Sequence, residues 1–342
     1  MTAPISTQIH LVSRPDGWPT PEDFNTVAVP LEPLADGEVR VRNEFVSVDP
    51  YMRGRMNLGR SYVPPFELDQ QITGAAVGRV VESRNEALPV GSPVTHSHGW
   101  SDIAQDHAST FQAVTEQPGL PLSVFLNILG STGLTAYTGL IKIAHMREGD
   151  TVFISGAAGA VGTAAGQIAK LLGAGRVVGS AGSAEKVALV TEKYGYDAAF
   201  NYKDPGSVAE KLHQVAPDGI DVYFDNVGGE HLEAAIGAFN DGGRAALCGA
   251  ITGYNTGNAE PGPRNMFNFI TRGLTMQGFT QGNYRWVVPE FTEQMTQWIR
   301  EGAISYEETI VDGIENTVEA FLGMMRGRNT GKMLVRVRPM QS

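Results

Sequence analysis

The sequence contains a single cysteine, Cys248, among 342 residues. One thiol cannot form an intramolecular disulfide, and it cannot supply the several ligands of a cysteine-based zinc cluster. The chain also lacks the apolar core of a signal peptide near its N-terminus, and it lacks a run of the roughly 18 apolar residues that a membrane helix requires. We therefore expect a cytoplasmic protein with no membrane partner.

Positive charge is also scarce. Lys and Arg together number 26, against 37 Asp and Glu, so the net charge is −11. Binding to nucleic acid phosphates requires clustered basic side chains, so we expect no nucleic-acid partner. A local pocket can still be positive on an acidic protein, and small anionic ligands therefore remain possible.

The chain is longer than one compact core usually supports, which predicts two domains. The first third contains short strand-like segments at 27–31, 38–43 and 75–82, and proline and glycine separate them. This pattern predicts a small, irregular β-barrel. The 41 glycines of the chain indicate many tight turns or close approaches of the backbone to a ligand.

From about residue 127, apolar strands alternate with helical stretches. The predicted strands are 151–155, 176–180, 198–202, 221–226, 244–249 and 274–279. Helical spacing predicts a helix over 163–172, and Ser183 is placed to cap another over 184–194. This alternation predicts an α/β domain with a doubly wound parallel sheet.

A late helix over 314–325 and a strand over 332–337 have no place in a complete six-stranded sheet. We expect them to return to the first domain. The predicted division is thus a substrate domain at 1–127, a dinucleotide-binding domain at 128–305, and a C-terminal return at 306–342.

The segment 151–163 carries the strongest functional signal. A predicted strand leads into Gly156, Gly159 and Gly162, and a predicted helix follows. Glycines allow the backbone to turn sharply and to approach a pyrophosphate, and a helix N-terminus offers free N–H groups to that anion. An ordinary glycine-rich turn is the alternative, but the alternating strands favour a dinucleotide site.

The end of the next strand bears on the choice between NAD and NADP. An acidic residue there would bind the ribose 2′-hydroxyl, but this chain has Ser180 at that position and Lys186 one short turn later. The absence of a carboxylate removes repulsion toward a 2′-phosphate, and a lysine adds attraction. We therefore predict NADP(H), although Lys186 could instead be a solvated helix lysine.

Several strings occur in an order that resembles the medium-chain dehydrogenase/reductase superfamily. Within it, the chain is similar to the zinc-independent group of leukotriene B4 12-hydroxydehydrogenases, prostaglandin reductases and alkenal double-bond reductases, which includes curcumin reductases. The strings are SVDPYMRGRM at 47–56, GLTAY at 133–137, GAAGAVG at 156–162, DNVGG at 225–229 and GRNTGK at 327–332. The resemblance covers nearly the whole chain and implies a GroES-like barrel domain joined to a Rossmann domain.

The resemblance also implies the cofactor contacts. They are the pyrophosphate loop, the 2′-phosphate lysine, an adenosine-side tyrosine, an asparagine at a strand end, two loops near the nicotinamide and a late asparagine. In this sequence these are Gly159, Ala160, Val161, Gly162, Lys186, Tyr202, Asn226, Cys248, Gly249, Ala250, Ile251, Tyr254, Phe279, Thr280, Gln281 and Asn329. Cys248 would line the site by its backbone, since a reactive thiol there has no visible base partner.

No metal site is expected. The zinc-dependent branch of the superfamily carries a Gly-His-Glu string, whereas the corresponding stretch here, 72–78, has neither His nor Glu. His96 and His98 form the only close histidine pair, and no third or fourth ligand is visible. We expect a surface or structural role for them.

Without zinc, a plain ketone lacks its usual Lewis acid, but an alkene conjugated to a carbonyl can accept a hydride at its β-carbon while an enolate forms. A donor at the carbonyl oxygen would stabilise that charge. Tyr254 is the first choice as this donor, although a cofactor hydroxyl could serve and leave Tyr254 only to orient the substrate. Tyr51 would line the substrate cleft, or it is a buried structural tyrosine.

The predicted function is thus NADPH-dependent reduction of enals and enones. One alternative is an NADPH:quinone oxidoreductase, and another is a cofactor-binding protein with little turnover. Lipid-derived alkenals, plant enones and keto-lipids fit the prediction equally well. A homodimer paired through edge strands near 274–279 is what the resemblance implies.

Overall fold

The computed structural model describes residues 4–59, 61–255 and 262–337. The chain divides into two compact units. The first contains residues 1–126, 308–329 and 333–342, and the second contains residues 127–307 and 330–332. In the described part of the chain, no helix is both long and apolar enough to span a membrane.

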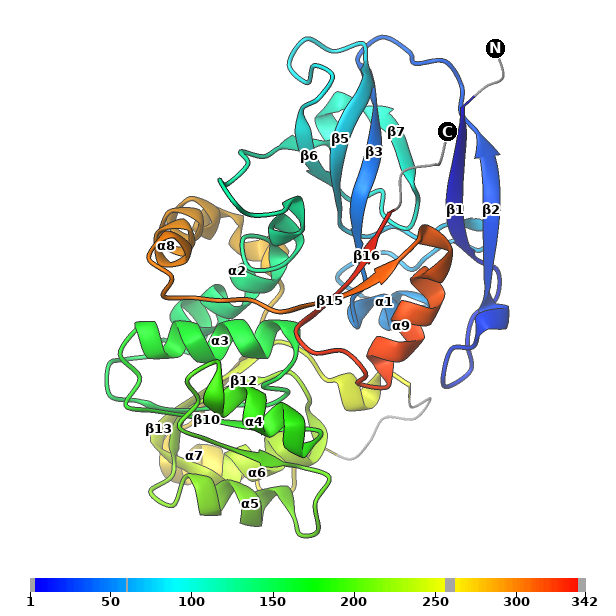
Figure 1. Ribbon diagram of the computed structural model, residues 1–342. Helices are drawn as coiled ribbons and strands as arrows, with labels where there is room; N and C mark the ends of the chain where they lie inside the picture. The colour runs from blue at the N-terminus through cyan, green and yellow to red at the C-terminus, as the bar shows by residue number, and fades with distance from the viewer. Residues whose placement is uncertain (1–3, 60, 256–261, 338–342) are drawn as a thin grey trace. The chain divides into compact units, whose positions relative to one another are not determined.

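Most strand pairs of the first unit are antiparallel (Figure 1). Its larger sheet has the order β15-β16-β3-β5-β6-β8, with β7 paired to β3, and a smaller sheet has the order β2-β1-β4. The strands are β1 (Ile5–Leu11), β2 (Phe24–Pro30), β3 (Glu38–Ser47), β4 (Gln70–Gln71), β5 (Ala76–Ser83), β6 (Pro93–His96), β7 (Ile103–His107), β8 (Gln112–Ala113), β15 (Glu308–Asp312) and β16 (Lys332–Arg336).

Apolar side chains at alternating positions of these strands form the core of the first unit. One cluster includes Val39, Val41 and Val80, and another includes Phe45 and Leu334. Leu334 belongs to β16, which pairs antiparallel with β3. The last strand of the chain is therefore held in a sheet made mostly of N-terminal residues. The described residues of the unit also form the α-helices α1 (Tyr51–Arg55) and α9 (Thr317–Met325), together with several short 3₁₀ turns.

The second unit contains a six-stranded parallel sheet with the order β11-β10-β9-β12-β13-β14. Numbered from its first strand, this order is 3-2-1-4-5-6, which is that of a doubly wound dinucleotide-binding fold. The strands are β9 (Thr151–Ile154), β10 (Arg176–Ala181), β11 (Ala198–Asn201), β12 (Ile220–Asp225), β13 (Phe239–Leu247) and β14 (Thr275–Gly278). The predicted fold class is confirmed.

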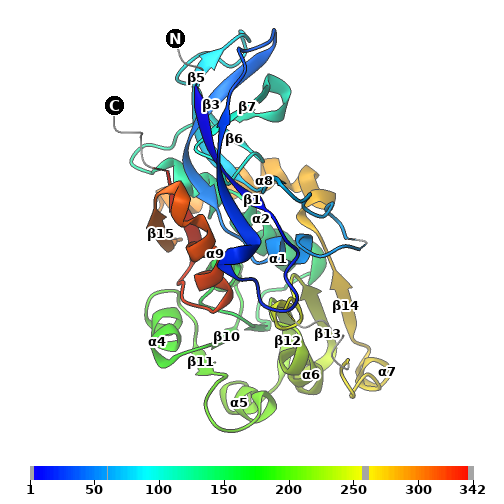
Figure 2. The same cartoon turned by 90° about the vertical axis from the view of Figure 1, so that its right-hand side faces the viewer.

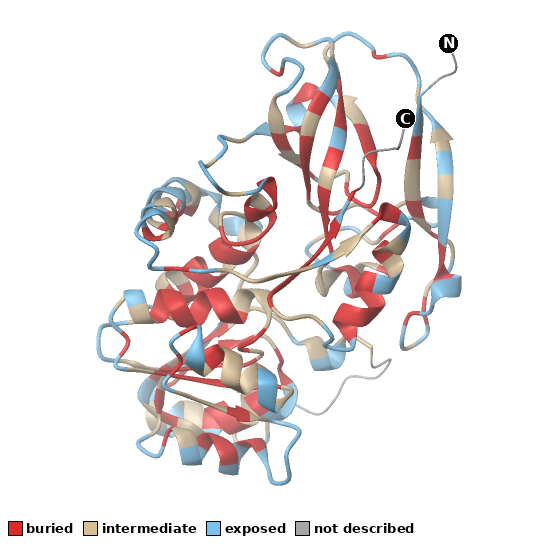
Figure 3. Ribbon diagram, viewed as in Figure 1, coloured by how far each residue is buried: buried red, intermediate tan, exposed pale blue. Residues whose placement is uncertain are grey.

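Helices flank this sheet (Figure 2). Those that follow its strands are α3 (Ala160–Leu171), α4 (Ala184–Glu192), α5 (Val208–Val215), α6 (Gly229–Ala238) and α7 (Asn268–Arg272), while α2 (Ser131–Thr138) precedes the sheet and α8 (Val288–Arg300) follows it. Helix α3 is almost entirely buried over its middle turns (Figure 3). Ala164, Ala165 and Gly166 lie there, and small side chains permit such close packing.

Several predicted boundaries were wrong by a few residues. Helix α3 begins at Ala160, three residues before the predicted start, because Gly159 already serves as its N-cap. Strand β13 was predicted at 244–249 but spans Phe239–Leu247, since the N–H groups of Cys248 and Gly249 both turn to the carbonyl of Asp225. The predicted helix 314–325 is a 3₁₀ turn at 314–316 followed by α9.

Candidate cofactor site in the second unit

The glycine loop connects β9 to α3. Gly156 has a φ of +63°, a backbone conformation that side chains disfavour. A Cβ atom on Gly162 would lie 2.3 Å from the carbonyl oxygen of Gly156, so no side chain fits there. The first-turn N–H groups of α3, at Ala160, Val161 and Gly162, have no acceptor within the helix. The loop is therefore a compact cradle that presents backbone donors to an anion.

Asn226 lies directly after β12, beside the start of this loop. Its side-chain amide donates to the carbonyl oxygen of Ser155 at 2.8 Å, and its backbone N–H donates to the Ser155 hydroxyl at 2.9 Å. Strands β9 and β12 are neighbours at the point where the strand order reverses. In such sheets, ligands bind outside the carboxyl ends of the strands at this point. Asn226 thus helps to fix the edge that would receive the cofactor.

A buried carboxylate supports the same edge. Asp225 Oδ1 accepts hydrogen bonds from the Tyr223 hydroxyl at 2.7 Å and from the N–H groups of Val227 and Gly228 at 2.9 and 2.8 Å. Burial raises the pKa of Asp225, while these hydrogen bonds act to lower it. The sequence gives no sign of this network beyond the DNVGG string that Asp225 opens.

The segment from Cys248 to Tyr254 follows β13 and packs against the turn after β12. The N–H groups of Cys248 and Gly249 donate to the carbonyl oxygen of Asp225 at 2.9 and 3.0 Å. The N–H of Ile251 makes a longer contact, 3.5 Å, with the carbonyl oxygen of Asn226. The predicted residues of this segment therefore lie together, next to Asn226.

Tyr254 lies at the end of this segment. A Cβ atom on Gly249 would lie 3.4 Å from the Tyr254 hydroxyl, which places the phenol over the backbone of Gly249. Burial raises the pKa of Tyr254, so its hydroxyl stays protonated at neutral pH and can donate a hydrogen bond. Burial, and then the nearby Asp225, also raise the pKa of Cys248 to about 12. Cys248 is thus a neutral thiol, and the alternative of a reactive thiolate finds no support here.

Lys186 lies in the first turn of α4, just beyond the end of β10. Ser183 caps this helix by accepting a hydrogen bond from the N–H of Lys186, as the sequence predicted. Burial lowers the pKa of Lys186, and the charge of Lys203 lowers it further. The hydroxyl of Tyr202 lies 3.0 Å from where a Cβ of Gly182 would be, so Tyr202 crosses the end of β10. Basic side chains and a tyrosine therefore gather at this corner.

Of the remaining predicted cofactor residues, Phe279, Thr280 and Gln281 follow β14 in the second unit, and Asn329 belongs to the first unit. Phe279 follows β14, and its N–H donates to the carbonyl oxygen of Leu247 at 3.3 Å. Thr280 and Gln281 come next and begin a 3₁₀ turn. Asn329 belongs to the first unit, two residues before Gly331, whose N–H donates to the carbonyl oxygen of Ala158 in the glycine loop.

Tyr51 begins helix α1 of the first unit. Burial raises its pKa most, the charge of Asp49 raises it further, and a hydrogen bond with Arg55 opposes both. The guanidinium of Arg55 also donates to the hydroxyl of Thr73 at 3.0 Å and lies 4.0 Å from the ring centre of Phe66. The phenol is therefore held by a fixed cation, whose role was not evident from the sequence.

Known proteins resemble the chain over nearly its whole length. Two family models match, described as the N-terminal domain of oxidoreductase at residues 7–114 and as zinc-binding dehydrogenase at residues 160–301. Prostaglandin reductase 1 of Bos taurus is 43% identical over 326 residues, covering 94% of this chain and 95% of that protein. The NADPH-dependent curcumin reductase of Escherichia coli K12 is 38% identical over 332 residues, covering 96% and 95%.

The 2-alkenal reductase (NADP(+)-dependent) of Nicotiana tabacum is 38% identical over 334 residues, covering 96% of this chain and 97% of that protein. These identities and coverages decide the family. The chain belongs to the prostaglandin reductase, curcumin reductase and 2-alkenal reductase group of medium-chain oxidoreductases. The resemblance predicted from the sequence is thus confirmed.

Solved structures with similar folds support this assignment. CurA of Vibrio vulnificus in complex with NADPH superimposes with a TM-score of 0.92 at 39% identity, covering 97% of this chain and 99% of CurA. The Escherichia coli quinone oxidoreductase complexed with NADPH has a TM-score of 0.76 at 20% identity, covering 96% and 99%. At that lower identity the likeness extends to the fold alone.

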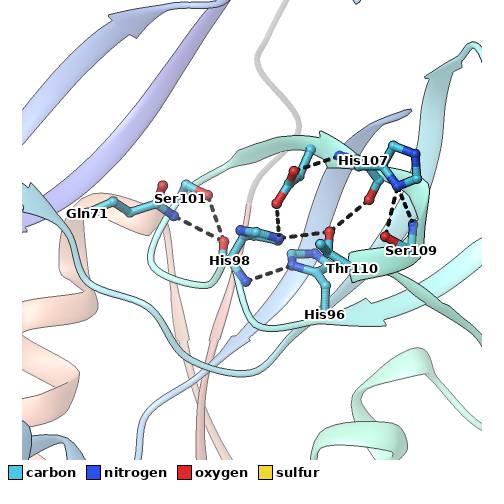
Figure 4. Close-up of polar contacts among 8 residues, drawn as sticks. Gln71, His96, His98, Ser101, His107, Ser109 and Thr110 are labelled. Atoms are coloured by element: carbon cyan, nitrogen blue, oxygen red, sulfur yellow. Dashed lines mark hydrogen bonds and ion pairs between the residues drawn. The ribbon is translucent and has the colours of Figure 1, made fainter. Parts of the chain in front are cut away.

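The second matched family is described as zinc-binding, which raises the question of whether His96 and His98 could bind a metal here. Figure 4 shows that the two rings lie beside each other within a network of polar contacts. Nδ1 of His96 accepts from the N–H of His98 at 3.1 Å, which leaves Nε2 to donate to Asn43 Oδ1 at 2.8 Å. Nε2 of His98 contacts the Thr110 hydroxyl at 3.1 Å and Asp106 at 3.2 Å.

Both ring nitrogens of His96 are thus engaged in hydrogen bonds within the protein, whereas a metal-binding histidine needs a free lone pair. Across the residues that the structure describes, no group of three or more His, Cys, Asp or Glu is arranged to hold a metal ion. The geometry favours a structural role for this pair.

Proposed function

We propose that the protein reduces the carbon–carbon double bond of α,β-unsaturated aldehydes and ketones with NADPH. The observation that carries this proposal is the glycine cradle beside Asn226 at the reversal of the strand order, in a chain of the enone and enal reductase group. Two of the relatives named above, the curcumin reductase and the 2-alkenal reductase, use NADP(H), as their names state.

The residues present fit this cofactor. A side chain at Gly162 would fill the cradle, and the corner around Lys186 and Lys203 supplies the positive charge that a 2′-phosphate requires. Gly159, Ala160, Val161 and Gly162 would hold the pyrophosphate, and Lys186 and Tyr202 would hold the 2′-phosphate and adenosine. Asn226, the segment from Cys248 to Tyr254, Phe279, Thr280, Gln281 and Asn329 would hold the nicotinamide half. When bound, NADPH supplies the hydride.

Tyr254 is the proposed hydrogen-bond donor to the substrate carbonyl. As negative charge builds on that oxygen, the Tyr254 hydroxyl stabilises it, and an elevated pKa keeps the proton available. The α-carbon of the resulting enolate then takes a proton from the solvent. We propose Tyr51 as a second residue that contacts the substrate, with Arg55 fixing its phenol.

A side-by-side assay tests the activity. We expect purified protein to oxidise NADPH with 2-alkenals and aryl enones and to do so far more slowly with a simple quinone. A protein that oxidised NADPH only with the quinone would be a quinone oxidoreductase. One that bound NADPH and turned over no member of the panel would be a cofactor-binding protein.

Tyr254→Phe tests the proposed donor. Losing one hydrogen bond to a developing oxyanion costs about 10²–10³ in turnover number, so we expect a loss of that order at saturating NADPH. An unchanged turnover number with an enal would limit Tyr254 to orienting the substrate or would remove it from the mechanism.

A homodimer and a cytoplasmic location complete the proposal. Strand β14 lies at the end of the sheet order, and Phe267 and Ile270 nearby are 69% and 78% exposed. An unpaired sheet edge beside exposed apolar side chains is suited to pairing with a second copy. Sedimentation should give a dimer for the native chain and a monomer for Ile270→Glu.

We also propose that residues 1–127 and 306–342 form the substrate domain and 128–305 the cofactor domain.

A further inference from the structure

The loop over 201–206 joins β11 to α5 and carries two side chains of the corner described above. Tyr202 is 37% exposed, and its ring meets that of His231 edge to face, with 5.3 Å between ring centres. Nε2 of His231 is buried and has no hydrogen-bond partner among the described residues. Lys203 follows Tyr202, and its ammonium nitrogen lies 5.9 Å from the centre of the Tyr202 ring.

A buried lysine fixes the shape of this loop. Lys211, on α5, is only 7% exposed. Its ammonium group donates to the carbonyl oxygens of Asp204 at 2.5 Å, Gly206 at 2.6 Å and Tyr202 at 3.4 Å. A lysine has three N–H donors, so the loop carbonyls use all of them and compensate for burial of the charge.

One side of the 201–206 loop faces an open depression. This depression of about 700 Å³ is lined by residues of α4, the end of β11, the loop itself and α5, including Lys211. The Asn201 side chain bonds to the Lys203 N–H and to Asp204 within the loop, and the Tyr202 N–H donates to the carbonyl oxygen of Ala181. On the open side, the three bonds of Lys211 add to these contacts. Removing them would loosen the segment that carries Tyr202 and Lys203.

The positive charges of Lys186 and Lys203 at this corner favour binding of an anion. Lys203 lies close enough to lower the pKa of Lys186, so two ammonium groups repel each other there. Lys203 forms no salt bridge with any described residue. The nearby carboxylates bond to other groups and do not pair with Lys203: Asp204 accepts from the Asn201 amide at 2.6 Å, and Glu210 accepts from the N–H of Ser207 at 2.9 Å.

We propose that the 201–206 loop is a second wall of the 2′-phosphate site, with Lys203 as its cation and Lys211 as the positioning residue that holds it in place. Lys186 approaches the phosphate from α4, and Lys203 approaches it from the end of β11. This inference rests on the proposed use of NADP(H), but it does not depend on which substrate is reduced.

Titration calorimetry with two adenosine nucleotides tests the inference without any turnover. The ligands are 2′,5′-ADP, which carries the 2′-phosphate, and 5′-AMP, which lacks it. We expect Lys203→Gln to weaken 2′,5′-ADP binding about tenfold, the value of one charge-assisted hydrogen bond, and to leave 5′-AMP binding within about twofold. Lys193→Gln is the matched control. Lys193 is also a lysine next to α4, but it lies at the C-terminal end of that helix, away from Lys186, and pairs with Glu307.

Lys211→Met should produce the same selective loss, about fivefold or more for 2′,5′-ADP, because the loop loses its three bonds. If this variant does not fold, Lys211→Gln replaces it, and a smaller but still selective loss is expected because an uncharged amide has two N–H donors in place of three. Equal losses for both nucleotides, or unchanged binding in the Lys203 and Lys211 variants, would overturn the inference. Tight and selective 2′,5′-ADP binding by a protein that reduces no enone would instead refute only the proposed activity.

Discussion

Protonation of His96 should destabilise the first unit as the pH falls. Burial, and then the charge of His98, lower the pKa of His96 to about 3. Its ring centre lies 5.6 Å from that of His98 and 5.0 Å from that of Phe111. Its Nε2 donates to Asn43 Oδ1, and its Nδ1 accepts from the N–H of His98. A second proton would have to enter at Nδ1, which already accepts a hydrogen bond.

The size of the effect follows from the difference between the folded and unfolded states. An unfolded histidine takes up its proton near pH 6.5, whereas the folded His96 does so only near pH 3. The stabilisation is therefore complete above pH 6.5 and is lost as the pH falls toward 3. Since one pKa unit corresponds to 1.36 kcal/mol, the loss between pH 7 and pH 5 is about 2 kcal/mol.

Urea unfolding at pH 7 and pH 5 measures this difference in native protein and in His96→Gln. The variant should be less stable at pH 7, but its free energy of unfolding should fall by about 2 kcal/mol less between the two pH values. Carboxylates titrate in both proteins, so their contributions cancel. His10→Gln is the control, since it removes a partly exposed histidine of β1. An identical pH dependence in native protein and His96→Gln would refute the reasoning.

Three further predictions concern the cofactor site. Lys186→Ala should raise the Michaelis constant for NADPH about tenfold or more while changing that for NADH little, because only NADPH carries the 2′-phosphate; equal changes for both would contradict the assignment. Gly162→Ala should weaken NADPH binding in calorimetry at least about tenfold, because its Cβ would lie 2.3 Å from a backbone oxygen, whereas Gly237→Ala, which meets only ordinary contacts, should bind normally. Cys248 should react with iodoacetamide at pH 8 about 1,000-fold more slowly than a small thiol, because a pKa of about 12 leaves little thiolate; mass spectrometry of this single thiol would show rapid alkylation if that were wrong.

The fold was largely predictable because its strands are short apolar runs with helical spacing between them. The glycine loop and the cap at Ser183 added local signals of known geometry. By contrast, strand β1 was overlooked although its apolar residues Ile9 and Leu11 alternate with polar ones and are fully buried. Helix α8 was also missed, and only Phe291, Met295 and Trp298 of its thirteen residues are buried.

The predicted cofactor residues of the second unit lie in loops and first helical turns at the carboxyl edge of the sheet, because a doubly wound fold binds its ligand outside that edge. The contacts that hold them were not predictable in the same way. The partners of Asp225 come from the residue after β9, from β12 and from the following turn, and only folding brings them together. Lys211 follows a capping-box helix start and would ordinarily be solvated, yet its ammonium group points into backbone carbonyls.

The most direct test of the central claim follows the hydride itself. NADPH deuterated at the transferred C4 position would be supplied with a 2-alkenal, in the presence of a metal chelator, and the product would be examined by NMR and mass spectrometry. The account predicts a saturated aldehyde that carries deuterium at its β-carbon, formed at a rate that the chelator does not change. Deuterium at the carbonyl carbon of an unsaturated alcohol, or activity that disappeared with the chelator and returned with zinc, would contradict it.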